Sequence, residues 1–332
     1  MEKGLMIDVG RKFWSLEDLR KLILLLKKEK LTHLQLHLSD SSGFRLKSEM
    51  YPEITSKECY IKEEMLDFLA FAKEQNITII PDIDSPGHLG VVLKEHPEFI
   101  LKYIDEKGNE QPAKDALDVS NPEAVAFIKN IYREFIAVFS GCSTWHIGGD
   151  EFIDFQTIEQ YPSLIQRSKE IFGQKATGLE FYVSYVNELT SLMKEQGITC
   201  RIWNDGFFRK DHVSIVELTK DVEVCYWTNW DKNMASIRFW LKKGYNIINF
   251  DDNDLYYVLG EKAGYTYPTL EHFKYNKFSG NQFLTEEEMK QVKGTFMSVW
   301  CDDFAAKTTT EIMADLAILL PKFVTELEKG QE

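Results

Sequence analysis

The sequence predicts a (β/α)8 TIM barrel formed by one domain over residues 1–332, and three observations lead to that fold class. Eight short runs rich in β-branched and apolar residues recur along the chain, segments of helical period separate them, and 332 residues suit one barrel domain. The runs cover residues 4–9, 31–38, 77–83, 144–147, 199–203, 222–227, 246–250 and 294–300. Because strands that alternate with helices form parallel sheets, eight such units favour a closed barrel.

Capping residues and helical periodicity predict the helices between these runs. Ser15 precedes one segment with Asp18 three residues later, and Asn121 precedes Pro122 at the start of another. Glycine or asparagine follows several of the segments, as is typical of helix ends. The expected helices include residues 16–29, 62–75, 122–139, 180–196, 235–243 and 309–329.

The composition excludes several functional classes. Apolar residues make up 44% and charged residues 28%, which is ordinary for a soluble globular protein. The net charge of −14 repels polyanions, so we expect no nucleic-acid partner and no acidic membrane surface. No apolar run approaches the ~20 residues that span a bilayer, and Met1 leads directly into a predicted strand. We therefore expect a cytoplasmic chain, or a secreted one whose signal has been removed.

Polar and aromatic residues gather at the carboxyl ends of the predicted strands, which is the face where barrel enzymes assemble their sites. In chain order these ends carry Asp8 and Arg11, His37 and Asp40, Asp82 with Asp84 and His88, Asp150 and Glu151, Trp203 with Asn204 and Asp205, Trp227, residues 251–254, and Trp300 with Asp302. We expect a site built from several of these loops.

The strongest local signal is the segment 144–152, TWHIGGDEF, which places Asp150 and Glu151 after two glycines at a strand end. The glycines allow a sharp turn that presents both carboxylates to a cleft. The alternative is an ordinary loop whose aspartate caps the next helix. Trp203, Trp227 and Trp300 each end a separate run and suit an apolar cup for a sugar face. Burial against such rings would raise the pKa of a carboxylic acid toward neutrality, as a general acid requires.

The letters GGDEF at residues 148–152 also spell the signature of diguanylate cyclases. That motif belongs on a hairpin in a smaller antiparallel-sheet domain, whereas here it follows a predicted buried strand. The sequence also lacks a glycine-rich phosphate-binding loop with a basic residue. A diguanylate cyclase is therefore a minor alternative.

His88 ends the segment 84–88, DSPGH, in which the Pro-Gly turn would direct the imidazole over the barrel mouth. There the imidazole could contact Glu151 on one side while Asp40 contacts the imidazole on the other. The alternative is a loop histidine exposed to solvent. His33, Gln35 and His37 alternate along one strand, but no carboxylate stands at a matching spacing and no H-E-x-x-H occurs. We expect no metal.

Seven ordered motifs resemble those of family 20 glycoside hydrolases, the β-N-acetylhexosaminidases, and in particular its compact single-barrel members. The motifs are DVGR (8–11), HLSD (37–40), DSPGH (84–88), HIGGDE (146–151), WNDG (203–206), YW (226–227) and SVW (298–300). The resemblance implies retaining hydrolysis of terminal β-linked GlcNAc or GalNAc, in which the substrate's 2-acetamido oxygen attacks C1 and forms an oxazolinium intermediate. The adjacent acids Asp150 and Glu151 fit that scheme, because two sequence neighbours cannot readily lie on opposite sides of one glycosidic bond as a conventional acid and nucleophile do.

The same resemblance implies a role for each matching residue. Glu151 would protonate the leaving oxygen, Asp150 would orient the acetamide, and the Asp40–His88 pair would tune the acid. The residues implied to bind substrate are Asp8, Arg11, Trp203, Trp227, Asp254, Tyr256, Trp300 and Asp302.

Two of these positions depart from the family pattern. Asp302 stands where relatives usually have glutamate, and Asp254 stands where they usually have the tyrosine that holds the acetamide oxygen. Either Tyr256 or Tyr257 takes that role, or recognition of the 2-substituent has changed. We expect a carbohydrate partner (a β-linked GlcNAc or GalNAc oligosaccharide, a glycoconjugate or poly-GlcNAc) and no cofactor, because the acid and the dipoles are protein-borne. A non-hydrolytic amino-sugar-binding protein on the same barrel is the alternative.

Overall fold

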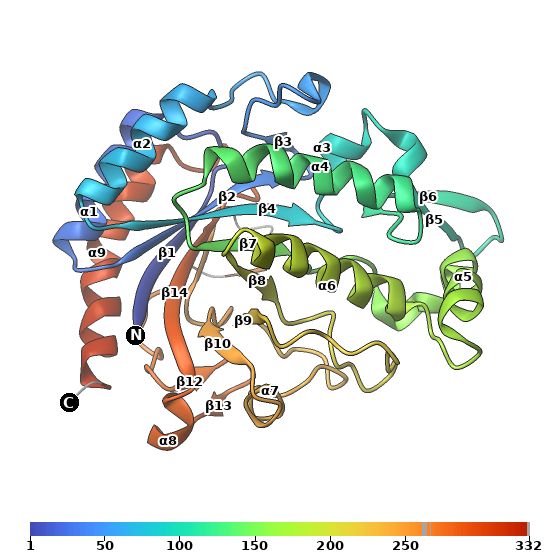
Figure 1. The fold of residues 1–332 in the computed structure, drawn as a ribbon. Helices are drawn as coiled ribbons and strands as arrows, with labels where there is room; N and C mark the ends of the chain where they lie inside the picture. Colours follow the sequence, from blue (N-terminus) through green and yellow to red (C-terminus); the bar gives the residue numbers. More distant parts are fainter. Residues whose placement is uncertain (261–263, 266, 331–332) are drawn as a thin grey trace.

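A closed parallel barrel forms the centre of the molecule in the computed structural model, which describes residues 1–260, 264–265 and 267–330. The strand order is β1-β14-β10-β9-β8-β7-β4-β2, and pairing of β1 with β2 closes the ring. The barrel strands are β1 (Glu2–Asp8), β2 (His33–Asp40), β4 (Thr78–Ser85), β7 (Thr144–Gly148), β8 (Thr199–Trp203), β9 (Val222–Tyr226), β10 (Asn246–Asn249) and β14 (Val292–Trp300). Each corresponds to one of the eight predicted runs, so the predicted (β/α)8 fold is confirmed (Figure 1).

Helices surround the strands on the outside of the barrel (Figure 1). They are α1 (Leu16–Lys28), α2 (Lys62–Glu74), α3 (Gly90–Leu93), α4 (Pro122–Val138), α5 (Pro162–Phe172), α6 (Leu179–Glu195), α7 (Ile237–Lys242), α8 (Glu286–Met289) and α9 (Thr309–Lys329), with 3-10 turns η1 (Pro52–Ile54), η2 (Pro97–Phe99) and η3 (Phe155–Gln160). Ser15 caps α1 by accepting from the Asp18 N–H at 3.1 Å, as the sequence predicts. α7 begins two residues later than predicted because Ser236 is its cap. No helix of the described segments is long and apolar enough to cross a membrane.

Several short strands lie outside the main ring. They are β3 (Gly43–Phe44), the hairpin of β5 (Ile100–Ile104) and β6 (Glu110–Leu117), β11 (Tyr256–Val258), and the pair β12 (Lys277–Phe278) and β13 (Gln282–Phe283). β11 matters most for the site, because it pairs in parallel with the last three residues of β14. It therefore carries residues 256–258 to the carboxyl-end face of the barrel.

Two buried clusters hold the barrel together. The larger lies between the strands and the helices, and the smaller fills the barrel interior around Met6, Ile80, Phe250 and Phe296. Charged side chains are buried inside the same ring, among them Asp82, which has no exposed surface. Because a buried charge must be paired, the interior is both an apolar core and a polar network.

Candidate active site

A cavity of about 530 Å³ opens at the carboxyl ends of the strands. Its charged lining consists of Arg11, Asp40, Asp84, His88, Asp150, Glu151 and Asp302, and its other lining residues are Trp227, Tyr256, Val258, Tyr265 and Trp300. Nine residues predicted to act in the site are thus brought together from loops far apart in the chain.

The turn after β7 determines where the two adjacent acids point. Gly148 and Gly149 have φ values of +76° and +93°, and a Cβ at Gly148 would lie 1.5 Å from Asp84 Oδ1. The turn places Asp150 in the cavity floor, 8% exposed, and leaves the Glu151 side chain 59% exposed at the mouth. Glu151 itself has φ of +43°, an unfavourable conformation for a side-chain-bearing residue. The surrounding structure must therefore hold it in place.

Asp205 supplies part of that hold. One of its carboxylate oxygens accepts the Glu151 backbone N–H at 3.0 Å, and the other accepts the Trp227 indole N–H at 3.0 Å. Burial raises the pKa of Asp205 to about 6, while the bond from Trp227 lowers it. The Asp205 side chain therefore links the backbone of Glu151 to the Trp227 ring. The sequence motif WNDG contains Asp205, but its role was not predicted.

His88 lies between three carboxylates. Its Nε2 is 3.3 Å from Glu151 Oε2 and 3.6 Å from Asp150 Oδ2, and its Nδ1 is 3.8 Å from Asp40 Oδ2. Burial alone would lower the pKa of His88, but Asp150, Asp40 and Glu151 outweigh it and raise this pKa well above its usual value. The imidazole is therefore protonated at neutral pH.

The charge states of the two adjacent acids differ from the expectation that the general acid has a raised pKa. The hydrogen bond from His88 lowers the pKa of Glu151, whereas burial raises the pKa of Asp150 to about 7 against the opposing effect of His88. The reason is geometric, because Glu151 is exposed and faces a cation while Asp150 is buried. In the free protein the proton thus resides on His88, whose Nε2 lies 3.3 Å from Glu151 Oε2.

Asp84 completes the floor and was not predicted as a site residue. Burial and the neighbouring Asp150 raise its pKa well above the usual range. Ligand atoms of Asp84, His88 and Asp150 all lie within 4.8 Å of one another, close enough to share a small cation. A protonated His88 already brings a positive charge to this position, which disfavours a metal ion there.

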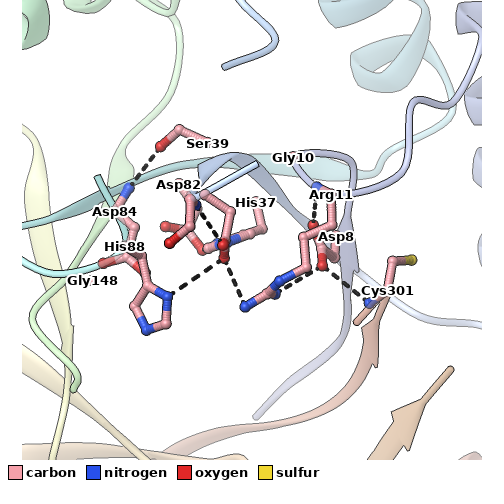
Figure 2. Close-up of polar contacts among 12 residues, drawn as sticks. Asp8, Gly10, Arg11, His37, Ser39, Asp82, Asp84, His88, Gly148 and Cys301 are labelled. Carbon is pink, nitrogen blue, oxygen red and sulfur yellow. Dashed lines mark hydrogen bonds and ion pairs between the residues drawn. The ribbon is translucent and has the colours of Figure 1, made fainter. Parts of the chain in front are cut away.

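Arg11 enters the cavity from the loop after β1, and Asp8 and Asp40 hold it. Its Nη1 lies 2.9 Å from Asp8 Oδ2 (Figure 2). Its Nη2 lies 2.9 Å from Asp40 Oδ2, and its Cζ lies 5.5 Å from the centre of the Trp300 ring. Asp8 also accepts the Cys301 N–H at 3.0 Å and is fully buried. The structure therefore places Asp8 behind Arg11, not on the cavity wall as expected, because both its oxygens are occupied.

Aromatic rings form the opposite wall. Tyr256 is stacked on Trp227, with ring centres 5.9 Å apart and planes 3° apart, and its ring centre lies 5.9 Å from Trp300 and 5.8 Å from Tyr265. These rings offer apolar faces suited to the C–H face of a sugar. Tyr265 follows no predicted strand, so no sequence pattern pointed to it.

Trp203 differs from the other two predicted tryptophans. It is 1% exposed and lies inside the barrel, with its ring centre 4.5 Å from that of His146, 4.9 Å from Phe250 and 6.1 Å from Trp300. As the last residue of β8 it points inward, below the cavity floor. Trp203 is not among the residues that line the cavity, although it packs in one cluster with Trp227, Tyr256 and Trp300, which do, so its expected place in the wall stays a prediction.

Asp254 also lies away from the cavity. Its carboxylate pairs with Lys277 Nζ at 2.6 Å, and both side chains are nearly buried. On β11 the side chains alternate, so Tyr256 faces the cavity while the Tyr257 hydroxyl donates to Asp315 on α9. Of the two tyrosines left open by the sequence, Tyr256 is the one in the cavity.

A parallel barrel with an acidic, aromatic-walled cavity at the carboxyl ends of its strands has the architecture of a barrel enzyme. Residues 3–314 match the family model described as glycosyl hydrolase family 20, catalytic domain. The chain therefore belongs to glycosyl hydrolase family 20, as the resemblance of its motifs suggests. The diguanylate cyclase alternative is wrong, because residues 148–152 end a barrel strand and begin no hairpin.

Curated and solved relatives agree with this assignment. The chain is 28% identical over 263 residues to a Lacto-N-biosidase of Bifidobacterium bifidum, covering 77% of this chain and 22% of that protein. It is 31% identical over 159 residues to Beta-hexosaminidase A of Caenorhabditis briggsae, covering 46% of this chain and 28% of that protein. The chain thus spans less than a third of the length of either relative.

Among solved structures, Dispersin B aligns with a TM-score of 0.75 at 21% identity, covering 98% of both chains. A structure of the tandem catalytic modules of pneumococcal exo-β-D-N-acetylglucosaminidase aligns with a TM-score of 0.76 at 22% identity, covering 98% of this chain and 82% of the other. At these identities the similarity establishes the shared fold.

Proposed function

We propose that the protein hydrolyses terminal β-linked N-acetylhexosaminides with retention of configuration, using the substrate's own 2-acetamido group as the nucleophile. One observation carries the proposal: Asp150 and Glu151 are sequence neighbours, one buried in the floor and one exposed at the mouth. Two such carboxyls do not flank a glycosidic bond from opposite faces, as an acid and a carboxylate nucleophile do. The nucleophile must then come from elsewhere, and the acetamide supplies it.

In the first step, the buried carboxylate of Asp150 accepts the acetamide N–H and stabilises the positive charge that develops on the ring. The acetamide oxygen bonds to C1 while the bond from C1 to the leaving oxygen breaks. Glu151 donates a proton to that oxygen. His88, protonated and 3.3 Å from Glu151, supplies this proton as the bound sugar displaces water from the acid.

In the second step, Glu151 accepts a proton from water while the water oxygen attacks C1 and the acetamide is restored. Tyr256 lines the same cavity, and its hydroxyl is the group we assign to the acetamide oxygen. Arg11 and Asp302 are the groups available for the hydroxyls at the far end of the ring. The names of the curated relatives, hexosaminidases and a lacto-N-biosidase, support an N-acetylhexosamine substrate, either GlcNAc or GalNAc.

The non-hydrolytic alternative loses the feature that favoured it. That feature was Asp254 at the family's tyrosine position, but Asp254 pairs with Lys277 and Tyr256 occupies the cavity. A binding protein would also gain nothing from a protonated histidine beside an exposed acid.

Substitution of the acid tests the proposal. Glu151→Gln should lower kcat on 4-nitrophenyl β-N-acetylglucosaminide by about 10² or more, the typical contribution of a positioned acid. Glu159→Gln, an exposed glutamate on η3, is the matched control and should retain wild-type rates. Wild-type turnover by Glu151→Gln would refute the assignment.

A second measurement addresses the acetamide. A thiazoline mimic of the cyclised intermediate should bind more tightly than the free N-acetylhexosamine product, because it resembles the intermediate. Asp150→Asn should reduce that preference. If the wild type bound the mimic and the product equally well, the substrate-assisted step would be refuted. The proposal of hydrolysis itself would still stand.

A further inference from the structure

The hydroxyl of Tyr182 reaches the turn that carries the two adjacent acids. Tyr182 lies on α6, is fully buried, and donates its O–H to the Gly149 carbonyl. Burial and the nearby carboxyls of Asp205 and Asp150 raise the pKa of Tyr182 well above its usual value, so the hydroxyl keeps its proton and remains a donor. A side chain from a surrounding helix thus holds the peptide group directly before Asp150.

The backbone is held on both sides of Asp150. Tyr182 binds the carbonyl oxygen of the peptide group before it. Asp205 accepts the N–H of the peptide group after it, that of Glu151, at 3.0 Å. Because each peptide group is planar, only the two backbone dihedral angles of Asp150 lie between them. Two hydrogen bonds that fix both groups therefore determine where the Asp150 side chain begins.

The Asp150 carboxyl depends on this backbone for its position. Its Oδ1 is buried and accepts no hydrogen bond from any residue that the structure describes. Its Oδ2 lies 3.6 Å from His88 Nε2, which is longer than a hydrogen bond. The carboxyl is thus left available to the acetamide N–H, and the backbone is the main determinant of where it lies.

Aromatic rings and one glycine hold Tyr182 itself in place. Its ring is stacked on that of Phe152, with centres 5.4 Å apart, and on that of Phe207, with centres 4.7 Å apart. A Cβ at Gly206 would overlap the Tyr182 hydroxyl oxygen. The glycine of the WNDG motif therefore leaves the space that this hydroxyl occupies.

We propose that Tyr182 is a positioning residue for the proposed reaction: through the Gly149 carbonyl it fixes the carboxyl of Asp150 where the acetamide binds. The proposal rests on the proposed function and deepens it, because it names a group outside the cavity on which the acetamide step depends. Tyr182 is fully buried, so it acts through Asp150 and does not touch the substrate.

Tyr182→Phe tests the proposal, because it removes the hydroxyl and keeps the stacked ring. On 4-nitrophenyl β-N-acetylglucosaminide it should lower kcat by roughly 10- to 100-fold, the scale of a displaced catalytic group, while KM stays within about 2-fold of wild type. Tyr245→Phe is the matched control. It removes another buried hydroxyl that donates to a backbone carbonyl, that of Leu218 at 2.8 Å, from the segment before β10. It should lose similar stability in urea denaturation and keep the wild-type kcat.

The affinity for the thiazoline mimic relative to the product distinguishes positioning from a loss of stability. Partial unfolding weakens both affinities by one factor and leaves their ratio unchanged, whereas a displaced Asp150 weakens the mimic more than the product. Tyr182→Phe should therefore lower this ratio. Its rate loss should be equal on 2,4-dinitrophenyl and 4-methoxyphenyl glycosides, because Asp150 acts on the acetamide while Glu151 acts on the leaving oxygen.

Gly206→Ala reaches the same hydrogen bond by a second route, because the added methyl displaces the Tyr182 hydroxyl. It should lower kcat and the mimic-to-product ratio as Tyr182→Phe does, and it carries the test alone if Tyr182→Phe does not fold. The double variant should lose less than the product of the two single losses.

Four results would overturn the role of Tyr182. They are a kcat of Tyr182→Phe within about 2-fold of that of Tyr245→Phe, an unchanged mimic-to-product ratio, a loss confined to the 4-methoxyphenyl glycoside, and single losses that multiply in the double variant. A wild type inactive on every aryl N-acetylhexosaminide would instead overturn the proposed function.

Discussion

Replacing Asp205 by asparagine removes the link between Glu151, the proposed acid, and the cavity wall. The carboxylate accepts two N–H groups, from the Glu151 backbone and from the Trp227 indole, each at 3.0 Å. An amide has one acceptor oxygen, so one N–H must face an NH2 group in a buried place. A lost hydrogen bond to a charged group costs about 1.5–3 kcal/mol, and we expect Asp205→Asn to lower the free energy of unfolding by that amount.

The same substitution should lower kcat more than it raises KM. Glu151 is held at φ of +43°, and a freed backbone shifts its carboxyl relative to the leaving oxygen. Misplacement of a catalytic group by about 1 Å costs on the order of 10² in rate. The assays are urea denaturation and steady-state kinetics on an aryl N-acetylglucosaminide.

Trp227→Phe provides the partner variant, because it deletes the second donor. In the double variant the amide no longer faces the indole N–H, so the double variant should lose less stability than the sum of the two single losses. A value of kcat for Asp205→Asn within about 2-fold of wild type, or additive stability losses, would refute the idea that this carboxylate couples acid and wall.

Three further predictions follow from the site. Burial raises the pKa of Asp150 to about 7, and in the proposed mechanism its carboxylate form accepts the acetamide N–H. We therefore expect kcat/KM to rise with pH toward neutrality and Asp150→Asn to flatten this acidic limb, and an unchanged limb in the variant would assign the titration to another group. Asp254→Asn should leave kcat/KM within about 2-fold of wild type while lowering thermal stability, because Asp254 pairs with Lys277 and not with substrate; a large activity loss without a stability change would contradict its placement. Prolonged treatment with EDTA should not change activity, since the position between Asp84, His88 and Asp150 already holds a proton; activity lost to EDTA and regained with a divalent cation would show a metal there.

The strands and most of the site could be predicted because they depend on short-range patterns. Each barrel strand is a β-branched or apolar run, and a parallel barrel brings all the carboxyl ends to one face. The helix α5 was missed although Leu164, Ile165, Ile171 and Phe172 recur at helical spacing in its sequence. The hairpin of β5 and β6 packs outside the barrel, and its exposed, mixed sequence gave no signal.

Side-chain direction at single positions could not be predicted, because it depends on where a strand ends and on how the next segment turns. Trp203 and Trp300 both end barrel strands, yet Trp203 is inside the barrel and Trp300 lines the cavity. Tyr256 reaches the cavity only because β11 pairs with the end of β14, a contact between segments about 40 residues apart. The lowered pKa of Glu151 likewise depends on a histidine from another loop.

The buried network beneath the cavity explains why His88 keeps its proton. His37 is fully buried, with Nδ1 3.0 Å from Asp82 and Nε2 3.0 Å from Asp40, and burial is outweighed by these carboxylates, which raise its pKa well above the usual value. An imidazole with acceptors on both nitrogens donates both protons and is therefore a cation. Together with Arg11 it keeps the pKa of Asp40 well below the usual range despite burial.

An Asp40 that is always ionised then stabilises the cationic form of His88, whose proton faces Glu151. Asp40→Asn should therefore lower the pKa of His88 and move the alkaline limb of kcat/KM to lower pH, because the proton that Glu151 needs is lost earlier. NMR titration of the His88 imidazole gives the same shift independently of turnover. If the His88 resonance titrates identically in the variant and the wild type, the barrel interior is a structural ion network with no influence on the acid.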